Sequence, residues 1–104
     1  MAHTPEKKVK IKVTTLLKSY GVYFFSPVTG GYGSSGVPDI ICCVNGLFLA
    51  IECKAGKGKT TALQDLNIAR IRKCGGIALV INESNIDELS IYLDNLTNVR
   101  QERT

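Results

Sequence analysis

The chain has 104 residues, of which 44% are hydrophobic and 21% are charged. This length supports one domain with a single core, and the composition is that of a soluble globular protein. No apolar run approaches the roughly 18 residues that a membrane-spanning helix needs, and residues 1–12 are charged rather than signal-like. We therefore expect a single domain over residues 1–104 that has no membrane partner. We expect it in the cytoplasm or, for a viral protein, in the host compartment that contains DNA.

The formal net charge is +4, and the basic residues gather in the first segment, around residues 54–59 and around residues 70–73. Such clustering favours binding to a polyanion such as nucleic acid. A basic surface that only keeps the protein soluble is the alternative.

The inventory of reactive residues excludes several kinds of site. The four cysteines show no C-x-x-C spacing, so we expect reduced thiols that pack as small hydrophobes and no zinc site. The only histidine is His3, close to the N-terminus. A Ser/His/Asp triad and a Cys/His pair are therefore excluded.

Residues 4–21 carry the signals of a first helix. Thr4 is suited to the N-cap, Pro5 to the first turn, and Gly21 ends the apolar periodicity. Glu6 complements the positive end of the helix dipole and lies at the edge of the buried face. On the residues alone, Glu6 is either a surface acid or a site residue.

Residues 22–25 predict the first strand. The next segment, 31–36, spells the G-x-G-x-x-G of dinucleotide-binding proteins. That motif must open a helix, whereas this one leads into another strand, so we reject it. We expect a mobile loop that faces the substrate, with Tyr32 as a stacking side chain and Ser34 and Ser35 near DNA. A plain flexible connector is the alternative.

Residues 37–54 predict one β-hairpin. Two runs rich in β-branched residues flank Asn45-Gly46, the strongest short-range signal for a two-residue type I′ turn. If no bulge intervenes, this turn places Asp39 directly opposite Glu52 in a pair without ladder hydrogen bonds, and Lys54 on the same face. Both faces are otherwise apolar, so we expect the strands to be buried on both sides.

Two opposed carboxylates in a buried hairpin require a cation. Without one, Asp39 and Glu52 repel each other and one of them must take up a proton. Oxygen ligands, with open positions for water and substrate, suit Mg²⁺ or Mn²⁺ rather than zinc. The hairpin therefore predicts a site for one of these divalent ions.

The loop after the hairpin contains Gly58-Lys59-Thr60, which resembles the end of a phosphate-binding P-loop. A P-loop needs a glycine five residues before Gly58, and that position is Cys53, inside the strand. We therefore expect no nucleotide cofactor. Lys57 and Lys59 are assigned instead to contacts with the phosphate backbone of DNA.

A capping box over residues 61–64 predicts the start of a second helix, with Thr61 as the N-cap and Gln64 reaching back. Gln64 also shares a helical face with Ile68, and that face packs towards the sheet and points Gln64 at the carboxylates. Gln64 is therefore either a capping residue or a site residue.

The remaining residues complete an α/β fold. Residues 77–81 predict a buried strand, Ser84 is expected to cap a last helix, and residues 97–104 lack an apolar anchor and are expected to fray. The order is then αβββαβα, without an internal repeat or linker. It predicts three layers, in which helices flank a mixed sheet.

The motif residues resemble a known group of nucleases. Pro38-Asp39, twelve further residues and Glu52-Cys53-Lys54 resemble the PD-(D/E)xK signature. Gly36-Val37-Pro38-Asp39, with Gln64 ten residues past Lys54, is similar to the virus-type replication-repair (VRR-Nuc) family. The resemblance extends from about Glu6 to Ile81 and implies a restriction-endonuclease-like core.

The function that the resemblance implies is that of a metal-dependent endonuclease acting on DNA. Asp39, Glu52 and the main-chain carbonyl of Cys53 would hold Mg²⁺ or Mn²⁺. Lys54 would orient the attacking water and offset charge on the phosphorane. Glu6 and Gln64 would act as further catalytic groups, one on a water or second metal and the other in positioning.

The resemblance also implies a homodimer that cleaves branched, Holliday-junction-like DNA, in a phage or a DNA repair context. Interface candidates are the apolar side chains that one sheet face and one helix face do not need, namely Tyr23, Phe24, Phe25, Leu63 and Leu66. Two alternatives remain open. One is a basic domain that binds nucleic acid without cutting it, and the other is a nuclease subunit of a larger repair or helicase assembly.

Overall fold

The computed structural model describes residues 3–28 and 35–103, with side chains up to residue 97. Its elements are, in chain order, α1 (Pro5–Ser19), β1 (Tyr23–Phe25), β2 (Ile40–Val44), β3 (Leu47–Cys53), α2 (Ala62–Lys73), β4 (Ile77–Ile81) and α3 (Ile86–Arg103). The predicted order αβββαβα is confirmed. None of the helices in these ranges is long and apolar enough to cross a membrane.

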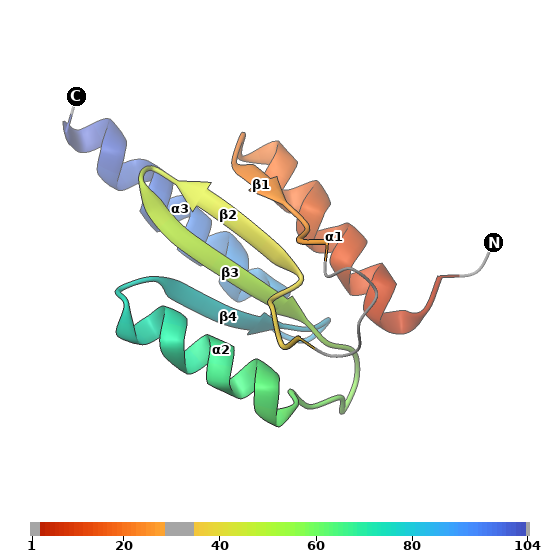
Figure 1. The fold of residues 1–104 in the computed structure, drawn as a ribbon. Helices are drawn as coiled ribbons and strands as arrows, with labels where there is room; N and C mark the ends of the chain where they lie inside the picture. Colours follow the sequence, from red (N-terminus) through yellow and green to blue (C-terminus); the bar gives the residue numbers. More distant parts are fainter. Residues whose placement is uncertain (1–2, 29–34, 104) are drawn as a thin grey trace.

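The strands form one mixed sheet in the order β1-β2-β3-β4. The pairs β1–β2 and β2–β3 are antiparallel, whereas β3 and β4 are parallel. A parallel pair needs a crossover connection, which α2 supplies. In Figure 1, α2 lies on one face of the sheet. Helices α1 and α3 lie on the opposite face, with α3 behind the sheet in this view. The predicted three-layer α/β architecture is confirmed.

The larger core lies between the sheet and the pair α1 and α3. Burying a Leu, Ile or Val side chain contributes roughly 1.5 to 3 kcal/mol, so this layer provides most of the stability. Its buried residues are Val9, Val13, Leu17, Ile40, Cys42, Val44, Leu49, Ile51, Cys53, Ile81, Leu89 and Leu93. The smaller core under α2 consists of Ala50, Ile68 and Ala78.

The hairpin has the predicted turn and register. Asn45 and Gly46 have positive φ angles of 52° and 83°, as a type I′ turn requires. The ladder runs from Val44 opposite Leu47 to Ile40 opposite Ile51 without a bulge. Asp39 therefore lies just before the first residue of β2, at the level of Glu52 in the register.

The sheet face towards α2 is covered over only part of its length. Cys43 and Phe48, which are cross-strand partners near the turn, are exposed, and so are Tyr23 and Phe25 on β1. The expectation that the hairpin is buried on both faces is wrong at this end. The reason is that α2 packs chiefly against β4 and leaves β1 and the turn end of the hairpin open.

Thr4 and Thr61 cap α1 and α2 as predicted, through their side-chain oxygens. The prediction that Ser84 caps α3 is wrong. Its hydroxyl donates instead to Oδ1 of Asn82 at 2.6 Å. The same Asn82 oxygen accepts the main-chain N–H of Asn85 at 3.2 Å, so an Asx-type turn precedes the helix.

The end of α3 also differs from the prediction. Residues 97–104 are expected to fray, but the backbone is helical as far as Arg103. The Thr97 hydroxyl donates to the carbonyl oxygen of Leu93 at 2.7 Å, one turn earlier. This bond occupies the Thr97 side chain without breaking the helix.

Candidate active site

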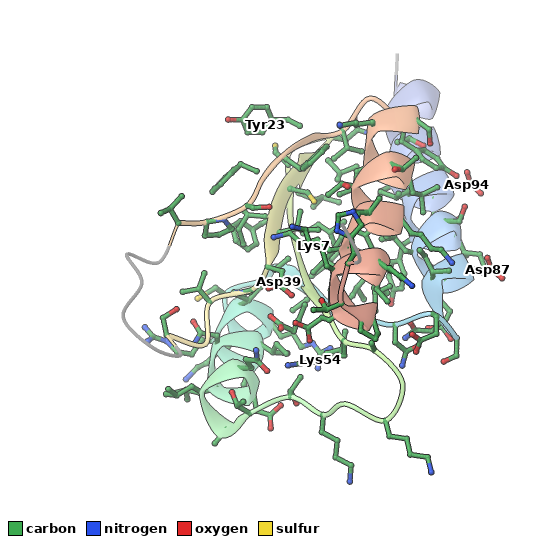
Figure 2. The ribbon with its side chains drawn as sticks, turned by 90° about the vertical axis from the view of Figure 1, so that its right-hand side faces the viewer. Lys7, Tyr23, Asp39, Lys54, Asp87 and Asp94 are labelled. Atoms are coloured by element: carbon green, nitrogen blue, oxygen red, sulfur yellow. The ribbon has the colours of Figure 1, made fainter. Side chains whose placement is uncertain are left out.

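The candidate site lies at the end of the sheet where β3 ends and β2 begins. Figure 1 shows that α1 and α2 both begin at this end, so several elements contribute side chains. Figure 2 shows Asp39, Lys54 and Lys7 in this part of the molecule. The predicted residues that contacts link here are Glu6, Asp39, Glu52, Lys54 and Gln64.

The Asp39 carboxylate is tied to β3. Its Oδ2 accepts the main-chain N–H of Cys53 at 2.8 Å. Because the ladder ends at Ile40 and Ile51, this oxygen replaces the main-chain acceptor that a longer strand would offer. Asp39 is thus held beside Glu52 by a side-chain bond rather than as a member of the strand.

Glu52 is the buried carboxylate of the site, with 3% of the residue exposed. Its Oε2 accepts a hydrogen bond from Gln64 Nε2 at 2.9 Å and lies 3.7 Å from Lys54 Nζ. Its Oε1 is buried and has no hydrogen-bond partner among the described residues. A buried oxygen of this kind is costly unless a cation or a proton occupies it.

The electrostatic environment of Glu52 favours its neutral form. Burial and, after it, the neighbouring charge of Asp39 raise the pKa of Glu52 from 4.5 to about 7, against the opposing effect of Lys54. Glu52 therefore takes up a proton near neutral pH unless a cation binds in place of that proton. The repulsion between Asp39 and Glu52 is expected from their opposed positions in the hairpin.

Lys54 lies between two carboxylates from different elements. Its Nζ is 3.9 Å from Glu6 Oε1 and 3.7 Å from Glu52 Oε2, and its side chain is only 13% exposed. Its main-chain N–H donates to the carbonyl oxygen of Ile81 at 2.9 Å, which fixes the end of β3. Glu6 is half exposed and reaches the site from the first turn of α1 through this ion pair.

Gln64 makes both of the contacts that the sequence left as alternatives. Its Oε1 accepts the main-chain N–H of Thr61 at 2.9 Å and completes the capping box. Its Nε2 donates to Glu52. The side chain that starts α2 therefore also orients the buried carboxylate.

Asp39 and Glu52 fit a hard divalent cation. They offer only oxygen atoms, including the buried Oε1 that lacks a donor, and Mg²⁺ is commonly held by one or two carboxylates with waters completing its shell. Within residues 3–28 and 35–103, no group of three or more His, Cys, Asp or Glu residues is arranged to hold a metal. Burial raises the pKa of Cys42 and of Cys53 to about 12, so both thiols are protonated at neutral pH.

A cavity of about 310 Å³ opens beside Asp39. It is lined by Thr4, Glu6, Lys7, Lys10, Asp39 and Cys53. The sequence predicts Glu6, Asp39 and Cys53 for the site but not the two lysines. The signal that could have found Lys7 and Lys10 is their spacing, because residues three apart share one face of a helix.

Three of the residues predicted to contact DNA, Lys57, Lys59 and Ser35, take no part in the contacts that link this cluster. Lys57 and Lys59 are exposed in the loop after β3. The main-chain carbonyl of Ser35 accepts a hydrogen bond from Asn67 of α2 at 3.4 Å, so Ser35 lies against this helix. Tyr32 and Ser34 lie outside the described residues.

Gly36 explains why the chain before Asp39 approaches α2 so closely. It has a φ of +75°, and a Cβ at this position would lie 2.5 Å from the carbonyl oxygen of Leu63. Only glycine accepts this conformation and this contact without strain. The glycine of Gly36-Val37-Pro38-Asp39 therefore has a packing role.

Comparison with known proteins gives a match in structure. A solved structure named "VRR_NUC domain protein" has a TM-score of 0.54 to this chain and 21% sequence identity, and the alignment covers 98% of this chain and 89% of that one. No family model and no curated protein matches the chain. The restriction-endonuclease-like fold predicted from the motif residues is supported by this likeness. The chain therefore shares its three-layer α/β fold with a VRR_NUC domain protein.

Proposed function

We propose that the protein belongs to the VRR-Nuc family and is a metal-dependent endonuclease that hydrolyses phosphodiester bonds in DNA. The observation that carries the proposal is the buried Oε1 of Glu52, which has no donor among the described residues and lies beside Asp39 at the end of the sheet. A domain that only binds nucleic acid gains nothing from paired carboxylates, because they repel phosphate. The fold shared with a VRR_NUC domain protein supports the same conclusion.

Asp39, Glu52 and the main-chain carbonyl of Cys53 are the proposed ligands of Mg²⁺ or Mn²⁺. When bound, such an ion would polarise the scissile phosphate and lower the pKa of a water. Gln64 holds Oε2 of Glu52 and thereby leaves Oε1 for the ion.

Around the proposed metal site, the charge of Lys54 offsets the negative charge that develops on the phosphate and helps to orient the attacking water. Glu6 is ion-paired to Lys54, and we propose that its carboxylate accepts a hydrogen bond from that water or binds a second metal. Lys57 and Lys59 are proposed to contact the DNA backbone, because both are exposed cations in the loop that follows β3. Tyr32, Ser34 and Ser35 are proposed to contact the same DNA.

The substrate is proposed to be branched DNA, cut by a homodimer. The uncovered sheet face supports this assembly, because Tyr23 and Phe25 on β1 and Phe48 on β3 expose 70%, 48% and 46% of their surfaces on one side of the sheet. Phe24 packs against the core and does not contribute. Leu63 and Leu66 of α2 are also exposed apolar side chains. Two subunits related by a two-fold axis would make symmetric cuts in a four-way junction.

Cleavage of labelled duplex, flap and four-way-junction DNA during a titration with Mg²⁺ or Mn²⁺ tests the proposal. We expect metal-dependent cuts that EDTA abolishes, and a loss of activity of at least about a thousandfold in Asp39→Asn, since removal of a metal ligand takes away several kcal/mol of transition-state stabilisation. Asp87→Asn is the matched control, because Asp87 lies on α3, away from Asp39 (Figure 2). Activity of Asp39→Asn within about tenfold of the wild type would contradict the metal assignment. DNA binding without metal-dependent cleavage would support the non-catalytic alternative.

A further inference from the structure

Two lysines of α1 line the cavity beside the carboxylates, and the proposed chemistry does not use them. Lys7 and Lys10 share the walls of this cavity with Asp39, Glu6 and Cys53. They lie three residues apart on α1, so their side chains leave the same face of the helix. Figure 2 shows Lys7 in the same region as Asp39. Two basic residues thus line the cavity next to the proposed metal ligands.

Neither lysine has a carboxylate oxygen within the 4.0 Å of an ion pair in the part of the chain whose side chains are described. The ion pairs of the site belong to Lys54, which lies within 4.0 Å of both Glu6 and Glu52. Lys7 and Lys10 form no ion pair by the same distance limit, within residues 3–28 and 35–97. Lysine is a common phosphate-binding residue that acts as a point charge. The chemistry that fits two lysines without an ion-pair partner is therefore an anion, and phosphate is the anion that the neighbouring site would process.

We propose that Lys7 and Lys10 form a subsite for a backbone phosphate of the nucleic-acid strand, adjacent to the phosphodiester held at Asp39 and Glu52. The assignment rests on the proposed nuclease function. The cavity volume of about 310 Å³ is at the lower end of the roughly 300 to 1,000 Å³ that is usual for ligand pockets. It therefore suits one nucleotide unit of one strand.

The salt dependence of DNA binding tests the subsite without relying on cleavage. The variant Lys7→Ala/Lys10→Ala is compared with Lys8→Ala/Lys18→Ala, which removes the same charge from exposed positions of the same helix that do not line the cavity. Binding of a fluorescein-labelled single-stranded oligonucleotide is followed by anisotropy in EDTA. We expect the slope of log K against log salt to become shallower by about 1 in the cavity variant and to change little in the control. An equal change in both variants would overturn the subsite, and Lys7→Arg/Lys10→Arg is expected to restore the slope.

A second measurement uses the wild-type protein and does not depend on how a variant folds. An amine-reactive reagent is applied with and without the oligonucleotide, and mass spectrometry reads the modified lysines. We expect DNA to protect Lys7 and Lys10 while Lys8 and Lys18 continue to react. Inorganic phosphate alone is expected to give little protection, and protection equal to that by DNA would contradict a strand-backbone subsite.

The two proposals fail in different ways. Protection of Lys7 and Lys10 by DNA that is never cut with Mg²⁺ or Mn²⁺ would contradict the nuclease and support the subsite. Metal-dependent cleavage with both lysines still reactive would overturn the subsite and support the nuclease. In cleavage assays, the cavity variant is expected to raise KM more than it lowers kcat, because these lysines bind the strand away from the reacting atoms.

Discussion

Replacing Glu52 with glutamine is expected to stabilise the metal-free protein at neutral and alkaline pH. Burial, with help from Asp39, raises the pKa of Glu52 from 4.5 to about 7, so the folded protein binds this proton more tightly than the unfolded chain. The folded wild type therefore loses stability as the pH rises from 4.5 to about 7, and above about 7, where Glu52 is ionised in both states, the loss stays constant. At about 1.4 kcal/mol for each pKa unit, the loss amounts to roughly 3 kcal/mol.

Because Glu52 is only 3% exposed, solvent does little to reduce this penalty. Glutamine keeps the shape of the side chain but carries no charge, so it avoids the penalty. The penalty already includes the favourable effect of Lys54, whose Nζ lies 3.7 Å from Glu52 Oε2, because the pKa of about 7 is the net result of all these causes. We therefore expect a net stabilisation of roughly 3 kcal/mol at about pH 8 that vanishes below the unfolded-state pKa of 4.5.

Urea denaturation in EDTA, followed by circular dichroism at several pH values, measures the free energy of unfolding of both proteins. Glu88→Gln on the exposed side of α3 is the control, and its effect should stay below about 1 kcal/mol at every pH. A difference between Glu52→Gln and the wild type that does not grow between about pH 5 and pH 8 would refute the reasoning. Adding Mg²⁺ should stabilise the wild type and leave the variant unchanged.

Three further predictions concern other parts of the molecule. Lys57→Ala/Lys59→Ala should make the slope of log K against log salt shallower by about one for each phosphate that the loop no longer neutralises, and an unchanged slope would exclude the loop from the DNA interface. Gly36→Ala should lower the free energy of unfolding by about 2 kcal/mol or more, since its Cβ would meet the Leu63 carbonyl oxygen at 2.5 Å. Thermal denaturation should show a smaller loss for Gly46→Ala, which has a φ of +83° but open space around it. Light scattering should report a dimer that Phe25→Asp dissociates, and a wild-type monomer with full activity on junctions would contradict the assembly.

Local signals predict the hairpin and the helix starts well, because these features depend on neighbouring residues. Asn45-Gly46 alone determines the turn, and the turn then places Asp39 beside Glu52 through a ladder without a bulge. The capping box at Thr61 is equally local. The roles of these residues in catalysis remain predictions.

Packing between distant elements accounts for the features that the sequence does not predict. The exposed positions of Cys43 and Phe48 follow from where α2 lies on the sheet, which no pattern within the hairpin reports. The cavity with Lys7 and Lys10 exists because α1 begins at the same sheet end as the carboxylates. The capping prediction for Ser84 is wrong because Asn82, two residues earlier, is a competing partner for its hydroxyl.

The side chain of Gln64 links the backbone of α2 to the chemistry of the site. It accepts the amide of Thr61 with one atom and donates to Glu52 with another. The first turn of the helix therefore cannot open without releasing the buried carboxylate, and the carboxylate cannot change partners without loosening the turn. Hydrogen exchange at the Thr61 amide thus becomes a remote reporter of site occupancy, readable in a protein that carries no probe at the site itself.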